Sequence, residues 1–278
     1  EIISTGGSFK EDVTKIPSPY QNNVINLNDG KGHTVFIESF RGCPFECQYC
    51  IWGDFDNEMS LFPIDQILKD IEIIYNNPNI RMVYFTDANI FYTRKRAKAI
   101  IDKIESCKYE IPSLVALDIL VVNEDMVHDL KRLTMFENAY NFGMQSTNPE
   151  TLRLSGRKAG VEMFGKKIPL IRKVDPNAEF SFDLLYGLPG DNFHYFRETT
   201  DFALSLHPRK LYFSNLLLLP GTPYWTDKEK HGFEYVDGFP YLVSGNNTYS
   251  VSDMEKTRDF AIWVMFVLYV HTIKETIH

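Results

Sequence analysis

Hydrophobic and polar positions along the chain switch repeatedly between two periods. Short runs rich in β-branched and aromatic residues, as expected of buried strands, are followed by stretches whose apolar residues recur every three or four positions, as expected of amphipathic helices. The strand-like runs are 34–40, 81–88, 112–120, 139–146, 179–190 and 210–222. The helix-like stretches are 62–77, 93–106, 123–133, 161–174 and 192–206.

This alternation predicts a parallel sheet covered by helices, because each strand–helix–strand unit forms a right-handed crossover. Six such strands can form either an open barrel or a doubly wound sheet. In both architectures ligands bind at the carboxyl ends of the strands. Polar residues that follow the strand-like runs are therefore the candidate site residues.

The two ends of the chain lack the alternation. Residues 1–33 are predicted to be a linker, residues 34–222 the core, and residues 223–278 a C-terminal extension that forms a small cap. The apolar run "FAIWVMFVLYV" at 260–270 is too short to span a bilayer and is interpreted as a buried helix, so no membrane association is expected. Because the chain opens on Glu1 and stops within a helical pattern, we expect it to be part of a longer protein.

The charge of the chain argues against a nucleic-acid partner. The 278 residues carry a net charge of −8, whereas binding to phosphates needs clustered Lys and Arg. The basic run "TRKRAKAIIDKI" at 93–104 is interpreted as the solvated face of a helix. No nucleic-acid partner is therefore expected.

Three of the four cysteines lie within eight positions, in "SFRGCPFECQYCIW" at 39–52. Two disulfides within so short a stretch are geometrically awkward, so Cys43, Cys47 and Cys50 indicate a metal site in a reducing compartment such as the cytoplasm. A loop can fold three thiolates around one iron–sulfur cube, and three ligands leave one iron with an open position. The alternative is a zinc site completed by Cys107 or His33.

With Tyr49 before the third cysteine, and directly after the first strand, this motif resembles the signature of the radical S-adenosylmethionine (SAM) superfamily. The stretches "IPSPY", "FGMQSTNPETLRLSGR", "DLLYGLPGD" and "LLLLPGTPYW" resemble its cobalamin-binding group. The resemblance implies an α/β fold, a partial (β/α)6 radical SAM barrel with a small C-terminal cap. It also implies a 4Fe–4S cluster, SAM, and cobalamin carried by a domain before the linker.

In that superfamily one electron from the reduced cluster cleaves SAM, and the resulting 5′-deoxyadenosyl radical abstracts a hydrogen atom from the substrate. The resemblance places Tyr49 near the adenine of SAM and gives Asp87 the SAM ammonium. Asp87 lies in "FTDAN", where the family commonly has Gly-Gly-Glu, so this assignment is less specific. Gln145 and Ser146 would bind the carboxylate and ribose of SAM, and Leu218 would border the adenine.

Two further assignments have alternatives. Arg157 either pairs with the SAM carboxylate or is an ordinary surface arginine near a turn. Asp183 either faces the ribose hydroxyls or anchors a neighbouring helix.

The predicted function is that of a cobalamin-dependent methyltransferase that acts on an unactivated carbon. Its expected partners are a small-molecule or peptide substrate and an electron donor such as flavodoxin or ferredoxin. One alternative is a radical rearrangement or cyclisation without methyl transfer, which would leave the product without an added methyl group. The other is a non-catalytic iron–sulfur or zinc protein, which would form no 5′-deoxyadenosine.

Overall fold

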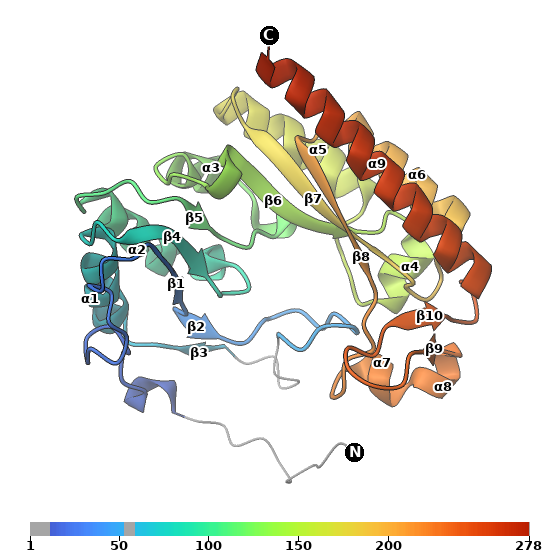
Figure 1. Ribbon diagram of the computed structural model, residues 1–278, viewed down its shortest axis with the longest axis horizontal. Coiled ribbons are helices and arrows are strands. Elements are labelled where there is room, and N and C mark those ends of the chain that lie inside the picture. The colour runs from blue at the N-terminus through green and yellow to red at the C-terminus, as the bar shows by residue number, and fades with distance from the viewer. Residues whose placement is uncertain (1–11, 53–58, 278) are drawn as a thin grey trace.

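A computed structural model describes residues 12–52 and 59–277. Its centre consists of six parallel strands in two three-stranded sheets (Figure 1). The first sheet has the order β1-β4-β5, formed by His33–Ile37, Ile80–Phe85 and Ser113–Leu114. The second has the order β6-β7-β8, formed by Ala139–Gln145, Glu179–Tyr186 and Lys210–Asn215.

The two sheets join into one curved layer. Parallel bridges link Ser113 to Met135 and Leu117 to Phe142, so β6 follows the segment that continues β5. Neighbouring strands thus follow the order of the chain throughout, as in an open barrel, whereas a doubly wound sheet reverses its order at a switch point. The predicted α/β class and the partial six-stranded barrel are confirmed.

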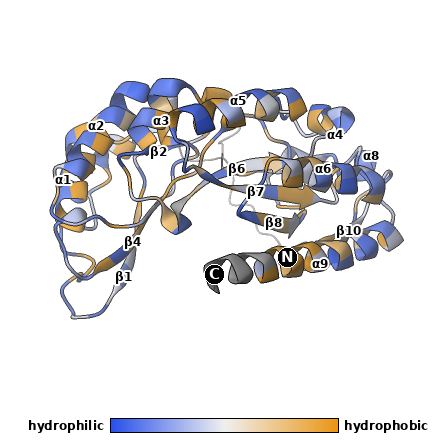
Figure 2. Cartoon of the chain, turned by 90° about the horizontal axis from the view of Figure 1, so that it is seen from above, coloured by the Kyte–Doolittle hydropathy of each residue, from blue (hydrophilic) through white to orange (hydrophobic). Residues whose placement is uncertain are grey.

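Six helices follow the strands on the outside of the layer (Figures 1 and 2). They are α1 (Ile64–Tyr75), α2 (Arg94–Glu105), α3 (Glu124–Leu130), α4 (Pro149–Leu154), α5 (Val161–Val174) and α6 (Phe193–Ser205). In α1 the apolar positions Ile67, Ile71 and Ile74 recur at helical spacing and are fully buried. The sequence did not predict α4, although Asn148 caps its first turn by accepting a bond from the backbone N–H of Glu150.

Two predicted strands are shorter than expected. The run 34–40 is divided into β1 and a short β2 (Phe40–Arg41), which pairs antiparallel with β3 (Ser60–Leu61). The run 112–120 contains only β5 and ends in a 3-10 turn at Ile119–Val121, because the Asp118 side chain accepts a bond from the N–H of Leu120 at 2.8 Å. Further 3-10 turns occupy Val13–Lys15, Ile90–Tyr92 and Phe136–Asn138.

The described part of the predicted linker packs on the barrel. The Ser18 hydroxyl donates to the buried Asp70 carboxylate on α1, and the Tyr20 hydroxyl donates to the carbonyl oxygen of Phe36 on β1. These bonds fix residues 18–20 against the first helix and strand. Residues 1–11 of the predicted linker lie outside the described residues.

The C-terminal extension begins with a small cap. It contains α7 (Pro223–Thr226), α8 (Lys228–His231), β9 (Glu234–Tyr235) and β10 (Val243–Gly245). The backbone N–H of Leu218, after β8, donates to the carbonyl of Tyr241 at 2.9 Å. At the other side of the cap, the N–H of Tyr224 donates to the carbonyl of Gln48 in the cysteine loop at 3.0 Å. The cap thus connects β8 to the cysteine loop.

The last helix, α9 (Val251–Ile277), corrects one prediction. It contacts β8 and α6 along one side, but Trp263, Phe266 and Val267 are more than half exposed, so the run 260–270 is not a buried helix. The physical reason is that the run 260–270 is apolar on every side of the helix, whereas only one face of the helix can contact the barrel. In the part of the chain that the structure describes, no helix has the length and apolar character needed to cross a bilayer.

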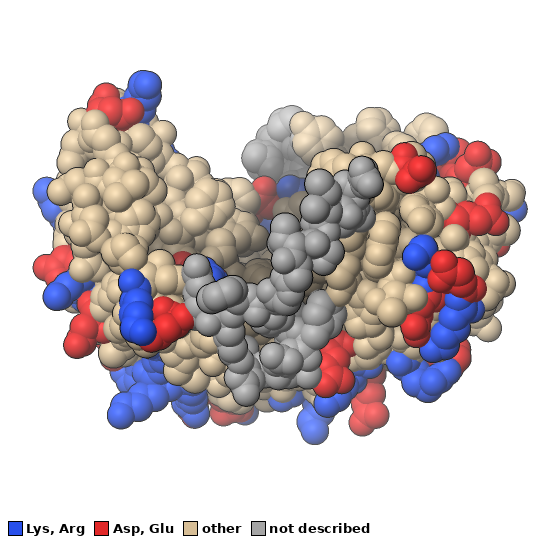
Figure 3. All heavy atoms as spheres, turned by 90° about the horizontal axis from the view of Figure 1, so that it is seen from below, with Lys and Arg blue, Asp and Glu red and all other residues tan. Residues whose placement is uncertain are grey.

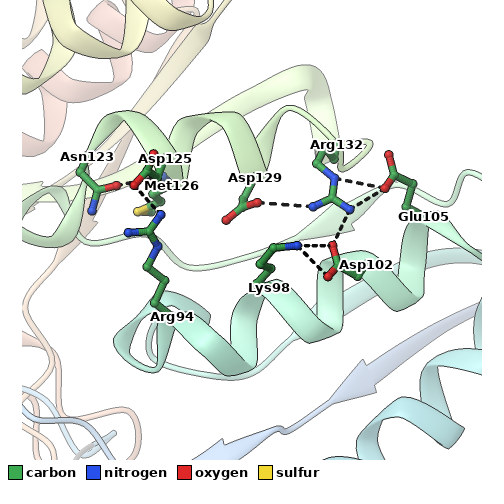
Figure 4. Close-up of polar contacts among 9 residues, drawn as sticks. All are labelled: Arg94, Lys98, Asp102, Glu105, Asn123, Asp125, Met126, Asp129 and Arg132. Atoms are coloured by element: carbon green, nitrogen blue, oxygen red, sulfur yellow. Dashed lines mark hydrogen bonds and ion pairs between the residues drawn. The ribbon is translucent and has the colours of Figure 1, made fainter.

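The basic run 93–104 on α2 takes part in a network of ion pairs with residues of α3 and the segment after it. Arg132 lies at the centre, with its guanidinium 2.7 Å from Asp102, 2.5 Å from Glu105 and 3.4 Å from Asp129 (Figure 4). Nearby, Lys98 pairs with Asp102 at 2.8 Å. The cations of α2 thereby take part in an ion-pair network with the end of α3.

Candidate functional site

The loop that carries the three cysteines is held from two sides. Its own turn is closed by a bond from the N–H of Cys50 to the carbonyl of Cys47 at 3.0 Å. The N–H of Gln48 donates to the carbonyl of Ser155, after α4, at 3.1 Å. Gly156, at φ +68°, allows this close approach, because a Cβ there would lie 2.6 Å from the carbonyl oxygen of Glu46. The loop is therefore fixed by main-chain contacts at both of its faces.

All three thiols line one cavity of about 200 Å³ at the carboxyl ends of the strands. The molecule is hollowed between the two halves of the barrel (Figure 3). None of the four cysteines is in a disulfide. The cavity wall near the thiols is aromatic, formed by Phe45, Tyr49, Trp52 and Tyr92. The ring of Phe45 meets the ring of Tyr92 edge to face, with centroids 5.5 Å apart.

Arg157 supplies positive charge at the thiols. Its Nη1 lies 3.8 Å from Sγ of Cys47, and its Nη2 donates to the carbonyl oxygen of Gly143 on β6. A guanidinium in this position compensates negative charge on thiolate ligands, and the low dielectric of a partly buried site strengthens the interaction. Arg157 is thus partly buried and lines the cavity, and its pairing with the SAM carboxylate stays a prediction.

The end of β6 is shaped to bring Gln145 over the cavity. Gln145 has φ +67°, and the register between β6 and β7 shifts between Gly143 and Gln145. A Cβ at Gly143 would lie 2.7 Å from Nε2 of Gln145. Gly143 therefore provides the space into which the Gln145 amide folds, and both residues line the cavity.

Asp183 on β7 belongs to a polar chain inside the barrel. Its Oδ2 accepts a bond from Nδ2 of Asn141 at 3.0 Å, and Ser181 donates to Oδ1 of Asn141 at 3.1 Å. Burial raises the pKa of Asp183 above its usual value. Asp183 and Asn141 also line a second cavity of about 350 Å³, so one polar pair separates the cysteine cavity from the interior of the barrel.

Three sequence-predicted residues lie elsewhere. Asp87 is buried, and its Oδ1 accepts bonds from the N–H groups of Ser39 and Phe40, both at 2.8 Å. Burial raises the pKa of Asp87 to about 6, while these backbone bonds act in the opposite direction. Oδ2 of Asp87 is buried with no hydrogen-bond partner among the described residues. The carboxylate thus braces the turn before the cysteine loop and lies outside the residues that line the cavity.

Ser146 and Leu218 also lie outside the cavity wall. The Ser146 hydroxyl donates to Oδ2 of Asp191 at 3.1 Å in a buried network beneath the turn after β6. Burial raises the pKa of Asp191 to about 7. Leu218 is fully buried between β8 and the cap. Of the predicted residues, the structure brings together the three cysteines, Tyr49, Gln145, Arg157 and Asp183.

Sequence reasoning missed two polar residues on the cavity wall, Asp118 and Asn141. Asp118 was detectable, because it lies near the end of the third strand-like run just as Asp87 lies near the end of the second. Asn141 interrupts an apolar strand, and a buried polar side chain within such a run is itself a signal of a site.

The donor set fits a cluster better than a single zinc ion. Among the described residues, no three His, Cys, Asp or Glu side chains converge as ligands of one metal ion. The thiolates of a cubane cluster each bind a different iron, so they need not converge. The proposed fourth zinc ligands lie elsewhere: Cys107 donates to the Lys103 carbonyl in α2, and His33, at the opposite end of β1, contacts Asp29 at 2.8 Å.

The Cys43 thiol is not preformed as a thiolate. Burial, with the neighbouring Cys47 and Cys50 thiols, raises the pKa of Cys43 to about 11. Coordination by a metal removes such a proton, because a bound cation inverts the local charge balance. The residues present therefore fit a group that supplies its own positive charge.

A family model for the radical SAM superfamily matches residues 37–203, more than half of the chain. This chain belongs to that superfamily. Its sequence is similar to tRNA-2-methylthio-N(6)-dimethylallyladenosine synthases. The protein from Sulfurihydrogenibium sp. is 24% identical over 203 residues, which cover 69% of this chain and 45% of that protein. The protein from Aliivibrio fischeri is 25% identical over 216 residues, which cover 72% of this chain and 44% of that protein.

Solved structures resemble the fold at low sequence identity. The cobalamin-dependent radical enzyme OxsB, with aqua-cobalamin and SAM bound, has a TM-score of 0.57 at 15% identity, over 84% of this chain and 41% of that chain. The methyltransferase TsrM from Kitasatospora setae, with tryptophan and a SAM analogue bound, has a TM-score of 0.63 at 17% identity, over 76% of this chain and 42% of that one. Coproporphyrinogen III oxidase from Escherichia coli has a TM-score of 0.60 at 15% identity, over 90% of this chain and 55% of that chain. The chain spans less than half the length of the curated relatives named above.

Proposed function

We propose that this chain is the radical SAM domain of a cobalamin-dependent methyltransferase that acts on an unactivated carbon in the cytoplasm. The observation that carries the proposal is the arrangement of three thiols and Arg157 around a cavity that adjoins a second, polar cavity inside the barrel. The likeness of the fold to the cobalamin-binding TsrM and OxsB supports the choice of reaction. The stretch "IPSPY", which packs on β1 through Tyr20, supports it as well.

The residues on the cavity wall would have separate roles. Cys43, Cys47 and Cys50 would hold a 4Fe–4S cluster, and Arg157 would balance its charge. When bound, the cluster and SAM supply an electron and a 5′-deoxyadenosyl radical. Gln145 and Asp183 offer polar groups for the SAM carboxylate and ribose.

The aromatic wall protects such chemistry from water. Tyr49 and Tyr92 are partly buried beside the thiols, and the indole N–H of Trp52 donates to the Thr86 carbonyl at 3.0 Å, which fixes the ring at the rim of the cavity. Burial is the main reason that the pKa values of both tyrosines lie well above their usual range, so both stay neutral. A wall of neutral rings excludes water without adding charge.

The second cavity is the proposed substrate site. Its volume of about 350 Å³ suits a small molecule or a peptide side chain. Its lining combines apolar side chains with hydroxyl and carboxylate groups. The polar groups include those of Tyr84, Ser113, Glu137 and Tyr212. Asn141, which lies on its border and is hydrogen-bonded to Asp183, would position a polar group of the substrate next to the reacting centre.

A second candidate function comes from the sequence relatives. Their name describes a methylthio group added to a tRNA adenosine, and 24% identity over 203 residues favours a related reaction. A radical rearrangement without group transfer is the third possibility. The experiment is product analysis by mass spectrometry after anaerobic reconstitution with iron, sulfide and cobalamin, with SAM that carries a labelled methyl group. A labelled methyl in the product supports the proposal; an added methylthio group, or an isomer with no added mass, contradicts it.

A further inference from the structure

A groove on the outer surface adjoins the cysteine cavity. It lies between α4 and α5 and encloses about 800 Å³. We name it the α4–α5 groove, defined by Leu120, Arg153, Arg157, Lys158, Val161 and Lys166. Val161 is 45% exposed, so the groove combines an apolar floor with basic side chains.

Two cations in this groove are available to a partner. Lys158 and Lys166 are exposed, and neither pairs with a carboxylate within the described ranges. By contrast, Arg153 pairs with Glu150 at 2.7 Å, and Lys167 donates to the Val122 carbonyl at 2.6 Å. The chain as a whole carries a net charge of −8, so the groove is a local basic site on an acidic protein.

The groove is also one side chain away from a cluster ligand. Arg157 lines both the groove and the cysteine cavity, and its Nη1 lies 3.8 Å from Sγ of Cys47. The loop after α4 that carries Arg157 is bonded to the cysteine loop through Ser155 and Gln48. A molecule bound in the groove would therefore contact Arg157, whose guanidinium in turn contacts the Cys47 thiol.

We propose that the α4–α5 groove docks an acidic one-electron carrier protein of the flavodoxin or ferredoxin kind. The inference rests on the proposed function, because it requires a cluster held by Cys43, Cys47 and Cys50. The reduced carrier loses one electron and the cluster gains it, with no bond formed or broken. Small, partly apolar contacts with a charged rim suit such transient electron-transfer partners.

The charges of the groove favour a carrier protein over RNA. RNA binding needs an extended basic surface that neutralises several phosphates, whereas this groove offers two unpaired lysines beside the acidic Glu162. The other basic run, on α2, is engaged with Asp102 and Asp125 (Figure 4). Contact with the cysteine loop would bring a docked electron donor close to the proposed cluster ligands.

The test compares two double charge reversals of the cluster-loaded chain. Lys158→Glu with Lys166→Glu changes the groove, and Lys69→Glu with Lys95→Glu changes two exposed lysines on α1 and α2. Anaerobic stopped-flow absorbance measures cluster reduction by the hydroquinone form of a bacterial flavodoxin. Fluorescence anisotropy measures the Kd for labelled flavodoxin at low and high salt. The reductant dithionite, which needs no docking surface, reports on the cluster site itself.

The proposal predicts that the groove reversal slows reduction by flavodoxin and raises its Kd, each by about tenfold or more at low salt. Lys158→Gln with Lys166→Gln should have a smaller effect of the same sign, and the α1–α2 reversal should change neither quantity by more than about twofold. Dithionite should reduce the cluster equally in all of them. Equal rates and affinities in both reversals would overturn the proposal, as would loss of tRNA binding with flavodoxin reduction intact. If the parent chain holds no reducible cluster, the proposed function itself fails.

Discussion

Nη1 of Arg157 lies 3.8 Å from Sγ of Cys47, although the two residues are 110 positions apart in the chain. The guanidinium is fixed by its second bond, to the Gly143 carbonyl, and so is held between β6 and the cysteine loop. This relationship places Arg157, the one positive side chain among the described residues of the cavity wall, beside a predicted cluster ligand. It distinguishes the loop from a simple metal-binding turn.

Removal of this charge should change the cluster without removing it. In Arg157→Met the three thiols remain, but the reduced cluster loses a stabilising positive charge, so its midpoint potential should become more negative. Formation of 5′-deoxyadenosine with dithionite should fall by about tenfold or more. The activity of Arg157→Lys should lie between that of the parent and that of Arg157→Met. Redox titration followed by electron paramagnetic resonance measures the potential. The matched control is Arg209→Met, an exposed arginine before β8; a potential equal to that of the control would refute the role of Arg157.

Gly143 should be required for SAM binding. In Gly143→Ala the new Cβ would lie 2.7 Å from Nε2 of Gln145, so the amide must leave its position over the cavity. We expect the Kd for SAM to rise by about tenfold, the effect of one lost polar contact of about 1.4 kcal/mol. Gly165→Ala is the control, since a Cβ there meets no atom within 4 Å, and alanine in a helix should be neutral or stabilising. Equal affinities in the two variants, measured by calorimetry, would mean that Gln145 has no such role.

Stability should fall as the pH rises through the acidic range. The pKa of Asp191 is about 7 in the folded protein against an ordinary 3.8, so between about pH 4 and 7 the folded protein keeps a proton that the unfolded chain releases. This group alone should lower the free energy of unfolding by roughly 1 kcal/mol for each pH unit in that window. Asp87, with a pKa of about 6, acts in the same direction over a narrower range.

Asp191→Asn removes the ionisation and should flatten the slope. Urea unfolding at three pH values between 5 and 7 measures it, with Asp201→Asn, exposed on α6, as the control. The interpretation is wrong if Asp191→Asn retains the slope of the parent.

Arg132 should contribute more to thermal stability than the other cations of its ion-pair network. Its guanidinium contacts three carboxylates, and its side chain is 25% exposed, whereas Arg94 forms one pair and is 55% exposed (Figure 4). Arg132→Gln leaves three carboxylates facing one another, so Tm should fall by about 2 to 4 °C at low salt. Arg94→Gln should change Tm by less than about 1 °C. The ranking is contradicted if the two variants have the same Tm, or if added salt does not reduce the difference between their Tm values.

The sequence predicted the parts of the site that depend on local pattern. The cysteine loop follows the first strand, Gln145 ends β6, and Asp183 lies in the carboxyl-terminal half of β7, so parallel topology brings them to one region. Asp87 also ends a strand, but the backbone amides of Ser39 and Phe40 occupy its Oδ1. That contact spans 48 and 47 positions, and nothing local in the sequence reveals it.

The same limit explains α9. Its composition is that of a buried helix, yet burial depends on how many neighbours the fold provides, and β8 and α6 contact only part of its surface. Asn141 shows the opposite case, in which a polar residue within an apolar strand marked a position on the cavity wall that the sequence pattern did not predict.

The central claim concerns the coordination of a cluster by three thiols, and its most direct measurement is 5′-deoxyadenosine formed by the anaerobically reconstituted chain with SAM and dithionite. The parent and Cys107→Ala should both form it, because the Cys107 thiol, just after α2, donates to the Lys103 carbonyl and does not line the cavity. Cys47→Ala should form none, and its cluster spectrum should be lost. Undiminished cleavage of SAM by Cys47→Ala would contradict the account.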